Sequence, residues 1–319
     1  MRYLVPVFLC LALAACGGDF SNDDLEFLNA LPQREDLAAT VPGQDKEAGW
    51  SARITGKTAL GVGRLGLPSG IIVDTDETGR RFNEVVDSML ASLETIRSAP
   101  PTEREPDRRV WGPYPDRRER RFEARFVMTR EGERFDYQLQ YRRVGEGEEA
   151  WWSFITGSFQ ANGGIRKGEG SLILELRRAR EKGFILGLDL LEREEIHYQT
   201  RTLPTSVSVV FVSMQPLLLP SKYTYRQGEG RVAEMTFEIQ GTDFVAGGLP
   251  EDVALTTRWA PDGRGSGSLR ILKGDIQGAQ YTECWDNRGR VTFISRSWDF
   301  INPTEGVRST CPDMTALER

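Results

Sequence analysis

The sequence predicts a mainly β protein, an antiparallel meander that forms a barrel or a strongly curved sheet, with one amphipathic helix near its N-terminus. From about residue 118 onward, apolar and polar residues alternate in short runs, the period of a strand with one buried face. Turns that contain glycine separate these runs, and strands joined by such turns pair as neighbours. A two-sheet sandwich is the alternative arrangement of the same strands.

The helix is expected at about residues 79–98. Apolar side chains recur there at steps of three and four residues, and two prolines end the pattern. The recurring positions are Phe82, Val85, Val86, Met89, Leu90, Leu93 and Ile96. The opposite side is polar, so the apolar side should pack on a sheet face or fill the end of a barrel. Just before the helix, Ile71–Val73 is interpreted as a short strand and Asp74–Gly79 as a turn.

The alternation of the meander is clearest in two neighbouring runs. The apolar positions of the first are Phe122, Ala124, Phe126 and Met128, and those of the second are Phe135, Tyr137, Leu139 and Tyr141. The turn between them contains Gly132, as is typical of a hairpin. Similar runs continue almost to the C-terminus, which predicts about ten to twelve strands.

The beginning of the chain has the organisation of an export signal. Arg2 precedes an apolar stretch from Tyr3 to Ala15, which is too short to span a bilayer as a helix. The stretch ends in Leu13-Ala14-Ala15-Cys16, which resembles the lipobox of the bacterial lipoprotein family. The resemblance implies that the signal is removed before Cys16, whose thiol carries a diacylglycerol and anchors the chain in a membrane. An ordinary secretory signal with a chance cysteine is the alternative.

The same resemblance implies a location. Gly17 follows the cysteine in place of the aspartate that favours the inner membrane, so we expect the periplasmic side of the outer membrane, with the inner membrane or the cell surface as alternatives. The polar composition that follows predicts a flexible tether. The expected divisions are the signal at 1–15, the tether at 16–50, a mixed segment with the helix at 51–117 and the meander domain at 118–319.

Cysteine content fits an oxidising compartment. With Cys10 in the signal and Cys16 acylated, Cys284 and Cys311 remain, and we expect them to form one disulfide. Two free buried thiols are the alternative.

Two motif-like strings precede the helix. Residues 61–66 match the glycine pattern of a dinucleotide-binding turn, but a proline follows closely and no helical period begins there, so we interpret them as a loop. Asp74, Asp76 and Thr78 have the spacing of the first oxygen ligands of a calcium loop. The final acid of such a loop is replaced by Val85, so the match is incomplete, and the alternative is that these residues cap the following helix. No other metal site and no cofactor is expected.

His197 is the only histidine of the chain, which excludes metal sites and catalytic pairs that need two imidazoles. Glu195 shares its strand face and is placed to pair with it. The sequence contains no Gly-x-Ser-x-Gly nucleophile motif. Paired carboxylates for glycan hydrolysis stay open, because their spacing in space is not visible in a sequence.

We therefore expect a non-catalytic, lipid-anchored envelope protein that binds an apolar ligand or a protein partner. Its architecture is similar to that of the lipoprotein-carrier proteins of the Gram-negative envelope, which pair a curved antiparallel sheet with helices over its mouth, although no residue motif carries this similarity. An envelope glycan hydrolase and a purely structural outer-membrane lipoprotein are the alternatives. The formal net charge of −6, with both signs interspersed, argues against nucleic acid as a partner.

Overall fold

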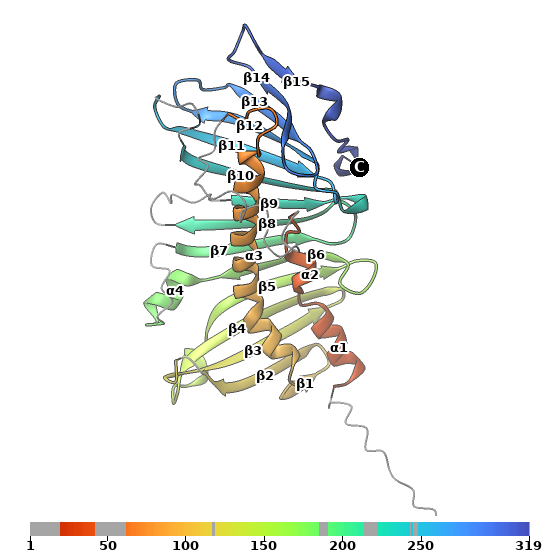
Figure 1. The fold of residues 1–319 in the computed structure, drawn as a ribbon. Coiled ribbons are helices and arrows are strands. Elements are labelled where there is room, and N and C mark those ends of the chain that lie inside the picture. The colour runs from red at the N-terminus through yellow and green to blue at the C-terminus, as the bar shows by residue number, and fades with distance from the viewer. Residues whose placement is uncertain are drawn as a thin grey trace, which may run out of the picture.

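The computed structural model describes residues 20–41, 62–116, 119–184, 191–213, 222–242, 244 and 248–318. Within these residues, one sheet of fifteen strands follows the order of the sequence, each strand antiparallel to the next (Figure 1). The helices are α1 (Asn22–Asn29), α2 (Arg34–Leu37), α3 (Gly70–Arg97) and α4 (Leu176–Glu181). The strands are β1 (Glu103–Glu105), β2 (Arg108–Pro115), β3 (Phe122–Glu131), β4 (Arg134–Arg143), β5 (Trp152–Ala161), β6 (Gly168–Leu174), β7 (Leu191–Gln199), β8 (Thr205–Ser213), β9 (Lys222–Gln227), β10 (Ala233–Thr242), β11 (Glu251–Trp259), β12 (Gly265–Lys273), β13 (Gln280–Trp285), β14 (Val291–Arg296) and β15 (Thr304–Gly306).

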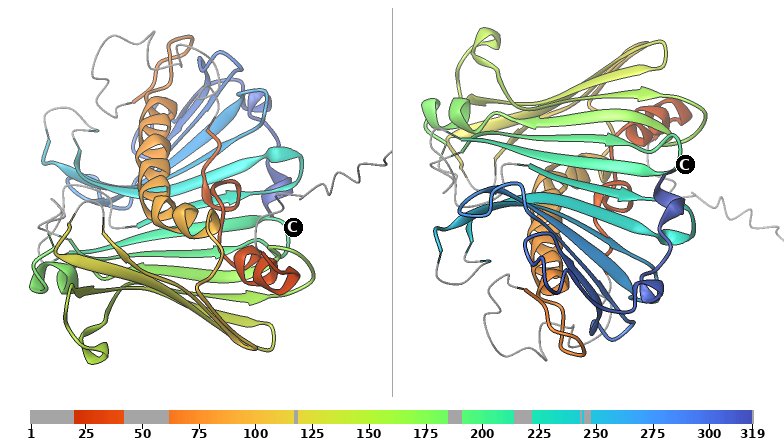
Figure 2. Two further views of the ribbon diagram at one scale, coloured as in Figure 1. Left: turned by 90° about the horizontal axis from the view of Figure 1, so that it is seen from below. Right: turned by 90° about the horizontal axis from the view of Figure 1, so that it is seen from above.

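The predicted fold class is confirmed, in its curved-sheet form. The sheet does not close into a barrel, because β1 and β15 lie at the two ends of the strand order. Figure 2 shows α1, α2 and α3 on the same side of the curved sheet. The meander begins at β1, earlier than the expected residue 118. The charged residues and prolines of β1 and β2 hide the alternation there, although β2 pairs with both of its neighbours.

The long helix α3 crosses the strands on the inner face of the sheet (Figure 1). Near its start, the hydroxyls of Thr75 and Thr257 on β11 lie 2.8 Å apart. Just past its end, Trp111 Nε1 on β2 donates to the carbonyl of Ala99 at 2.9 Å. A helix of 28 residues is ~42 Å long, and the strand spacings from β2 to β12 add up to ~48 Å. One helix therefore crosses the inner face of the sheet from about β2 to β12.

α3 begins at Gly70, so the strand and turn expected over 71–79 are wrong. Ser69 is the N-cap, and its hydroxyl accepts a hydrogen bond from the Ile72 amide at 3.2 Å. Ile71 and Thr75 are fully buried against the sheet, so the buried stripe of the helix extends to its first turn. The polar run from Asp74 to Thr78 that follows the first turn is typical of a loop, which concealed the stripe in the sequence.

Tyrosine rings fill space on the inner face that two glycines leave open. A Cβ on Gly157 would overlap the ring of Tyr137, and a Cβ on Gly170 would overlap the ring of Tyr198. Both tyrosines are buried, and Tyr198 stacks on Phe159 with centroids 6.2 Å apart. The inner face is therefore packed by aromatic side chains beneath α3, as a close-packed core requires.

Residues 20–41 belong to the core, so the expected flexible tether is wrong over this range. Phe27, Leu31 and Leu37 are fully buried, and Phe27 meets Phe135 of β4 edge to face. Asp24 is also fully buried and accepts a hydrogen bond from Arg109 Nε at 2.7 Å. The apolar pattern is short, and its partners lie on distant strands, which is why it resembles a linker in the sequence.

The expected disulfide is present. Cys284 of β13 and Cys311 are bonded, with Cα atoms 5.2 Å apart. The bond ties the C-terminal segment to the sheet, and Leu317 is buried beyond it. Among the helices that the structure describes, none combines the length and the apolar character that a membrane span needs.

Candidate functional site

The outer face of the sheet, turned away from α3, carries a row of short polar side chains. Each member pairs directly with the next across neighbouring strands, and eleven of the thirteen members are serine or threonine. We call these residues the hydroxyl row: Thr129, Asp136, Ser158, Ser171, His197, Ser208, Thr224, Thr236, Thr256, Ser268, Thr282, Ser295 and Thr304. At the usual strand spacing, the row runs for roughly 58 Å across the sheet.

Neighbouring hydroxyls in the row bond to one another. The bonded pairs are Ser158 with Ser171 at 3.1 Å, Thr236 with Thr256 at 3.3 Å and Ser268 with Thr282 at 3.3 Å. Each hydroxyl has one donor and two acceptor sites, so a bonded pair keeps free sites for a ligand. Threonine is favoured in strands but serine is not, so strand propensity alone does not explain the row.

Charged side chains border the row on the same face. Two residues away along the strands, Arg226, Glu234 and Arg258 form one such border. Glu234 is buried and accepts from Arg226 Nη1 at 3.1 Å and from Arg258 Nε at 2.7 Å. Because these charges are paired with one another, the border is fixed in place. From β8 to β15 the row itself carries no charge, which suits a neutral ligand rich in hydroxyl groups.

His197 lies within the row, and its side chain is 52% exposed. The predicted pairing with Glu195 is confirmed, since His197 Nε2 and Glu195 Oε2 are 3.2 Å apart. Burial alone would raise the pKa of Glu195, but hydrogen bonds from His197 and Arg193 hold it below its ordinary value. The imidazole is thereby oriented at the centre of the sheet. Sequence reasoning found the pair but missed the row, because only strand register reveals which residues are neighbours.

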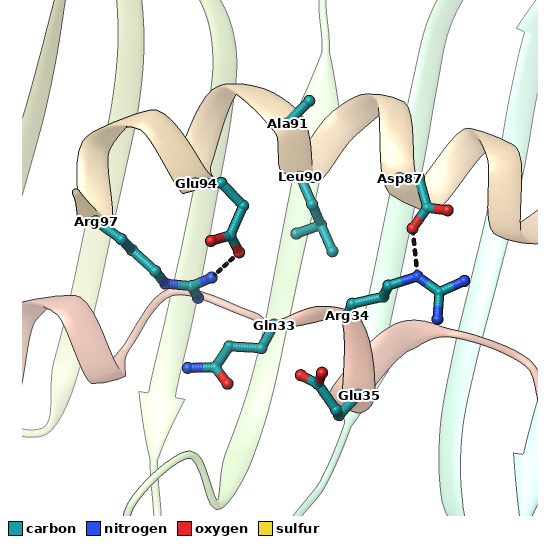
Figure 3. Close-up of a pocket in the computed structure, with 8 residues that line it drawn as sticks. All are labelled: Gln33, Arg34, Glu35, Asp87, Leu90, Ala91, Glu94 and Arg97. Atoms are coloured by element: carbon teal, nitrogen blue, oxygen red, sulfur yellow. Dashed lines mark hydrogen bonds and ion pairs between the residues drawn. The ribbon is translucent and has the colours of Figure 1, made fainter.

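A cavity of about 440 Å³ lies between α2 and α3 (Figure 3). Its lining residues are Gln33, Arg34, Glu35, Asp87, Leu90, Ala91, Glu94 and Arg97. Arg34 Nε donates to Asp87 at 2.7 Å, and Arg97 Nη2 donates to the carbonyls of Leu31 and Pro32 at 2.6 and 2.7 Å. Arg34 therefore joins α2 to α3, and Arg97 joins the segment before α2 to the end of α3.

The calcium candidates lie on α3 and not in a loop. Asp74, Asp76 and Thr78 occupy every second position of one helical segment, and Asp76 pairs with Arg80 at 3.5 Å. Burial, and then the charge of Glu77, raises the pKa of Asp74 to about 7. A calcium loop wraps its ligands around the ion, which a continuous helix cannot do, so the structure does not bring the three oxygens to one point. Within the described ranges, no group of three acidic, histidine or cysteine side chains is placed to hold a metal.

The glycine string at 61–66 is described only from residue 62 onward. Gly63 donates its amide to the Tyr281 hydroxyl at 2.8 Å, and Gly66 donates to the carbonyl of Val291 at 2.8 Å. Contrary to the sequence interpretation, a helix does begin shortly after this loop, at Gly70. The glycines dock the entry of α3 onto β13 and β14.

An aromatic cluster occupies one end of the inner face. Its rings are Phe122, Tyr141, Trp152, Phe154 and Phe184. Phe184 lies 5.0 Å from both Phe122 and Tyr141, and it stacks on Phe154 with centroids 6.0 Å apart. Phe154 and Phe184 are only partly buried, so this end of the core retains accessible apolar surface.

No protein-family model, curated protein or solved structure matches the chain. Cys16 and the rest of the lipobox lie outside the described residues, so lipidation stays a prediction.

Proposed function

We propose that the protein is a non-catalytic binding protein of the bacterial envelope, anchored through a lipid on Cys16, and that it binds a neutral glycan strand along the hydroxyl row. The single observation that carries the glycan proposal is the row of thirteen directly paired residues from β3 to β15, eleven of which are serine or threonine. The lipobox at Leu13–Cys16 supports the anchor.

A glycan strand presents hydroxyl groups at regular intervals along an extended chain. Serine and threonine hydroxyls both donate and accept hydrogen bonds, so each can pair with a glycan hydroxyl that acts as either acceptor or donor. The strands hold these hydroxyls in fixed positions, which lowers the entropy lost on binding. Each hydrogen bond contributes only about 1 kcal/mol, so useful affinity requires a long row and a polymeric ligand.

The row also favours binding over hydrolysis. Glycan hydrolysis needs two carboxyl groups on either side of the scissile bond. The row contains one acid, Asp136, which forms an ion pair with Arg134 at 2.8 Å. Asp136 therefore has no second carboxyl group within the row to complete such a pair.

Cosedimentation with insoluble glycans tests the proposal. Full-length protein in detergent is mixed with purified cell-wall sacculi or with chitin, and the bound fraction is measured. Ser158→Arg places a long charged side chain in the row, and we expect it to weaken binding at least about tenfold, which corresponds to ~1.4 kcal/mol. Ser153→Arg is the matched control, because Ser153 lies on the same strand and face, ~16 Å from Ser158. Absence of binding to both polymers, or equal loss in both variants, would contradict the proposal.

An apolar ligand is the second candidate, favoured by the partly exposed rings of Phe154 and Phe184. Native mass spectrometry of protein purified from envelopes, followed by solvent extraction, tests it. A lipid that copurifies with the protein and is lost in Phe184→Asp supports this candidate. A mass that corresponds to protein and its covalent anchor alone argues against it.

A further inference from the structure

Two neighbouring turns at one end of the strands expose aliphatic and basic side chains together. Ile165, between β5 and β6, is 75% exposed, and Leu203, between β7 and β8, is 55% exposed. Lys167 and Arg201 lie in the same two turns and are also exposed. We call these four residues the twin-turn surface. Aliphatic residues mixed with lysine and arginine are typical of surfaces that contact the interface of an anionic bilayer.

The twin-turn surface is held in place by the rest of the fold. β6 and β7 pair along their length, and Thr200 Oγ1 donates to the Arg166 carbonyl at 2.6 Å, which joins the two turns. The Arg166 guanidinium in turn bonds to Gln33 and lies 3.5 Å from Asp36 of α2. The four side chains are therefore displayed by a rigid edge of the molecule.

The start of the described chain lies at the same end of the strands. Successive connections of a meander alternate between its two ends, so the β1–β2, β3–β4, β5–β6 and β7–β8 turns share one end. Asp23, at the start of α1, pairs with Arg130 at 3.2 Å, and Arg130 is the next-to-last residue of β3, beside the β3–β4 turn. Figure 1 shows α1 and the β5–β6 connection on the same side of the molecule.

The distance to the predicted anchor is short. Only Gly17, Gly18 and Asp19 separate Cys16 from Phe20, the first described residue. Four Cα steps span at most ~15 Å even when fully extended. A lipid on Cys16 therefore keeps this end of the sheet close to the bilayer.

We propose that the twin-turn surface rests on the bilayer that holds the anchor, with Ile165 and Leu203 at the headgroup level and Lys167 and Arg201 against anionic phospholipid. This inference rests on the lipid anchor of the proposed function. It also fixes an orientation: the strands stand with their ends on the membrane, and the hydroxyl row, which crosses the strands, runs parallel to the membrane surface.

Fluorescence quenching by lipids tests the contact. In protein that is acylated at Cys16 as proposed, and with Cys284 bonded to Cys311, one introduced cysteine is the only free thiol of the mature chain. Full-length protein with Ile165→Cys or Leu203→Cys is labelled with an environment-sensitive dye and reconstituted into phosphatidylethanolamine and phosphatidylglycerol vesicles that contain a spin-labelled lipid. Val144→Cys is the matched control, since Val144 is 60% exposed at the opposite end of the strands.

We expect quenching at positions 165 and 203 to exceed quenching at position 144 about threefold. Lys167→Glu combined with Arg201→Glu should remove the difference, whereas Arg178→Glu combined with Lys182→Glu, near α4 at the other end, should not. Equal quenching at all three positions would overturn the inference.

Mass spectrometry of the same sample separates this inference from the anchor. If Cys16 is acylated and the labels at 165 and 203 are not quenched, the anchor stands and the twin-turn inference is wrong. If Cys16 is not acylated, the anchor is wrong, and cosedimentation of the same protein with the same vesicles decides the inference. Binding that Lys167→Glu with Arg201→Glu abolishes would support the surface, and no binding would overturn it.

Discussion

Asn83 of α3 and Ala39, in the segment after α2, are joined by two hydrogen bonds. The Ala39 amide donates to Asn83 Oδ1 at 2.7 Å, and Asn83 Nδ2 donates to the Ala39 carbonyl at 2.9 Å. The Asn83 side chain is almost completely buried. It therefore satisfies both polar groups of one backbone residue and fixes the N-terminal segment to the long helix.

Asn83→Ala should destabilise the fold by about 2 kcal/mol, because the amide and carbonyl of Ala39 lose their partners in a buried position. Urea unfolding followed by circular dichroism measures the change. Glu84→Ala, on the exposed side of the same helix, is the control and should change stability by less than about 0.5 kcal/mol. Equal stability of Asn83→Ala and the parent would show that residues 20–41 do not depend on this contact.

The general fold was visible in the sequence because it depends on local periods. Alternation of apolar residues along β3 and β4 and the helical period of Phe82 to Ile96 are each read within one element. The docking of α1 on the sheet and the first turn of α3 were missed because they are stabilised by residues far away in the chain, such as Arg109 for Asp24 and Thr257 for Thr75. Short elements of this kind depend on tertiary packing more than on propensity.

The hydroxyl row was not predictable for a different reason. Its members are neighbours only when the register of every strand pair is known. An irregularity shifts the register of β4 and β5 at Leu139 and Gln140, which lie between the β4–β5 connection and the row pair Asp136 and Ser158. Counting residues from one turn to the next would therefore misplace the row, whereas the pair of Glu195 and His197 lies on one strand and needs no register.

Glu194 on β7 predicts a pH dependence of stability. Its side chain is buried on the inner face, and burial raises its pKa to about 7. The folded state then holds a proton that the unfolded state has already lost between about pH 4.5 and 7, so stability should fall as pH rises through this window.

Glu194→Gln should remove the part of this fall that Glu194 causes and make the protein more stable than the parent above pH 7, by roughly 3 kcal/mol. Asp74, whose pKa burial also raises to about 7, should keep its own part of the fall in both proteins. At pH 4.5 the two proteins should be nearly equal. Urea unfolding at a series of pH values measures the stability of both proteins as a function of pH. Glu192→Gln, two residues away on the same strand and more exposed, serves as the control. If the stability of the parent, relative to that of Glu194→Gln, stayed constant or rose between pH 4.5 and 7, the assignment of the raised pKa to Glu194 would be wrong.

The disulfide should stabilise the C-terminal segment. It closes a loop with a sequence separation of 27, and loop closure of this length contributes about 3.5 kcal/mol in the chain-entropy model. Cys284→Ala combined with Cys311→Ala should lower the free energy of unfolding by about that amount, measured by urea unfolding. Reduction of the parent with dithiothreitol should produce the same loss of stability. The same treatment of the double variant should cause no further loss. A parent unaffected by reduction would contradict the prediction.

The docking of α3 on the sheet depends on the absence of a side chain at Gly267 of β12. A Cβ there would lie 2.5 Å from Cγ2 of Ile71, which is fully buried in the first turn of α3. Gly267→Ala should therefore cost about 2 kcal/mol by overpacking. Ile71→Ala removes the atoms that clash, so the double variant should be more stable than the sum of the two single losses predicts, by at least about 1 kcal/mol.

Gly70→Ala is the control, because no atom lies within 4 Å of a Cβ at that position and alanine favours the helix. Strict additivity of the two variants in urea unfolding would show that α3 does not meet β12 at this point.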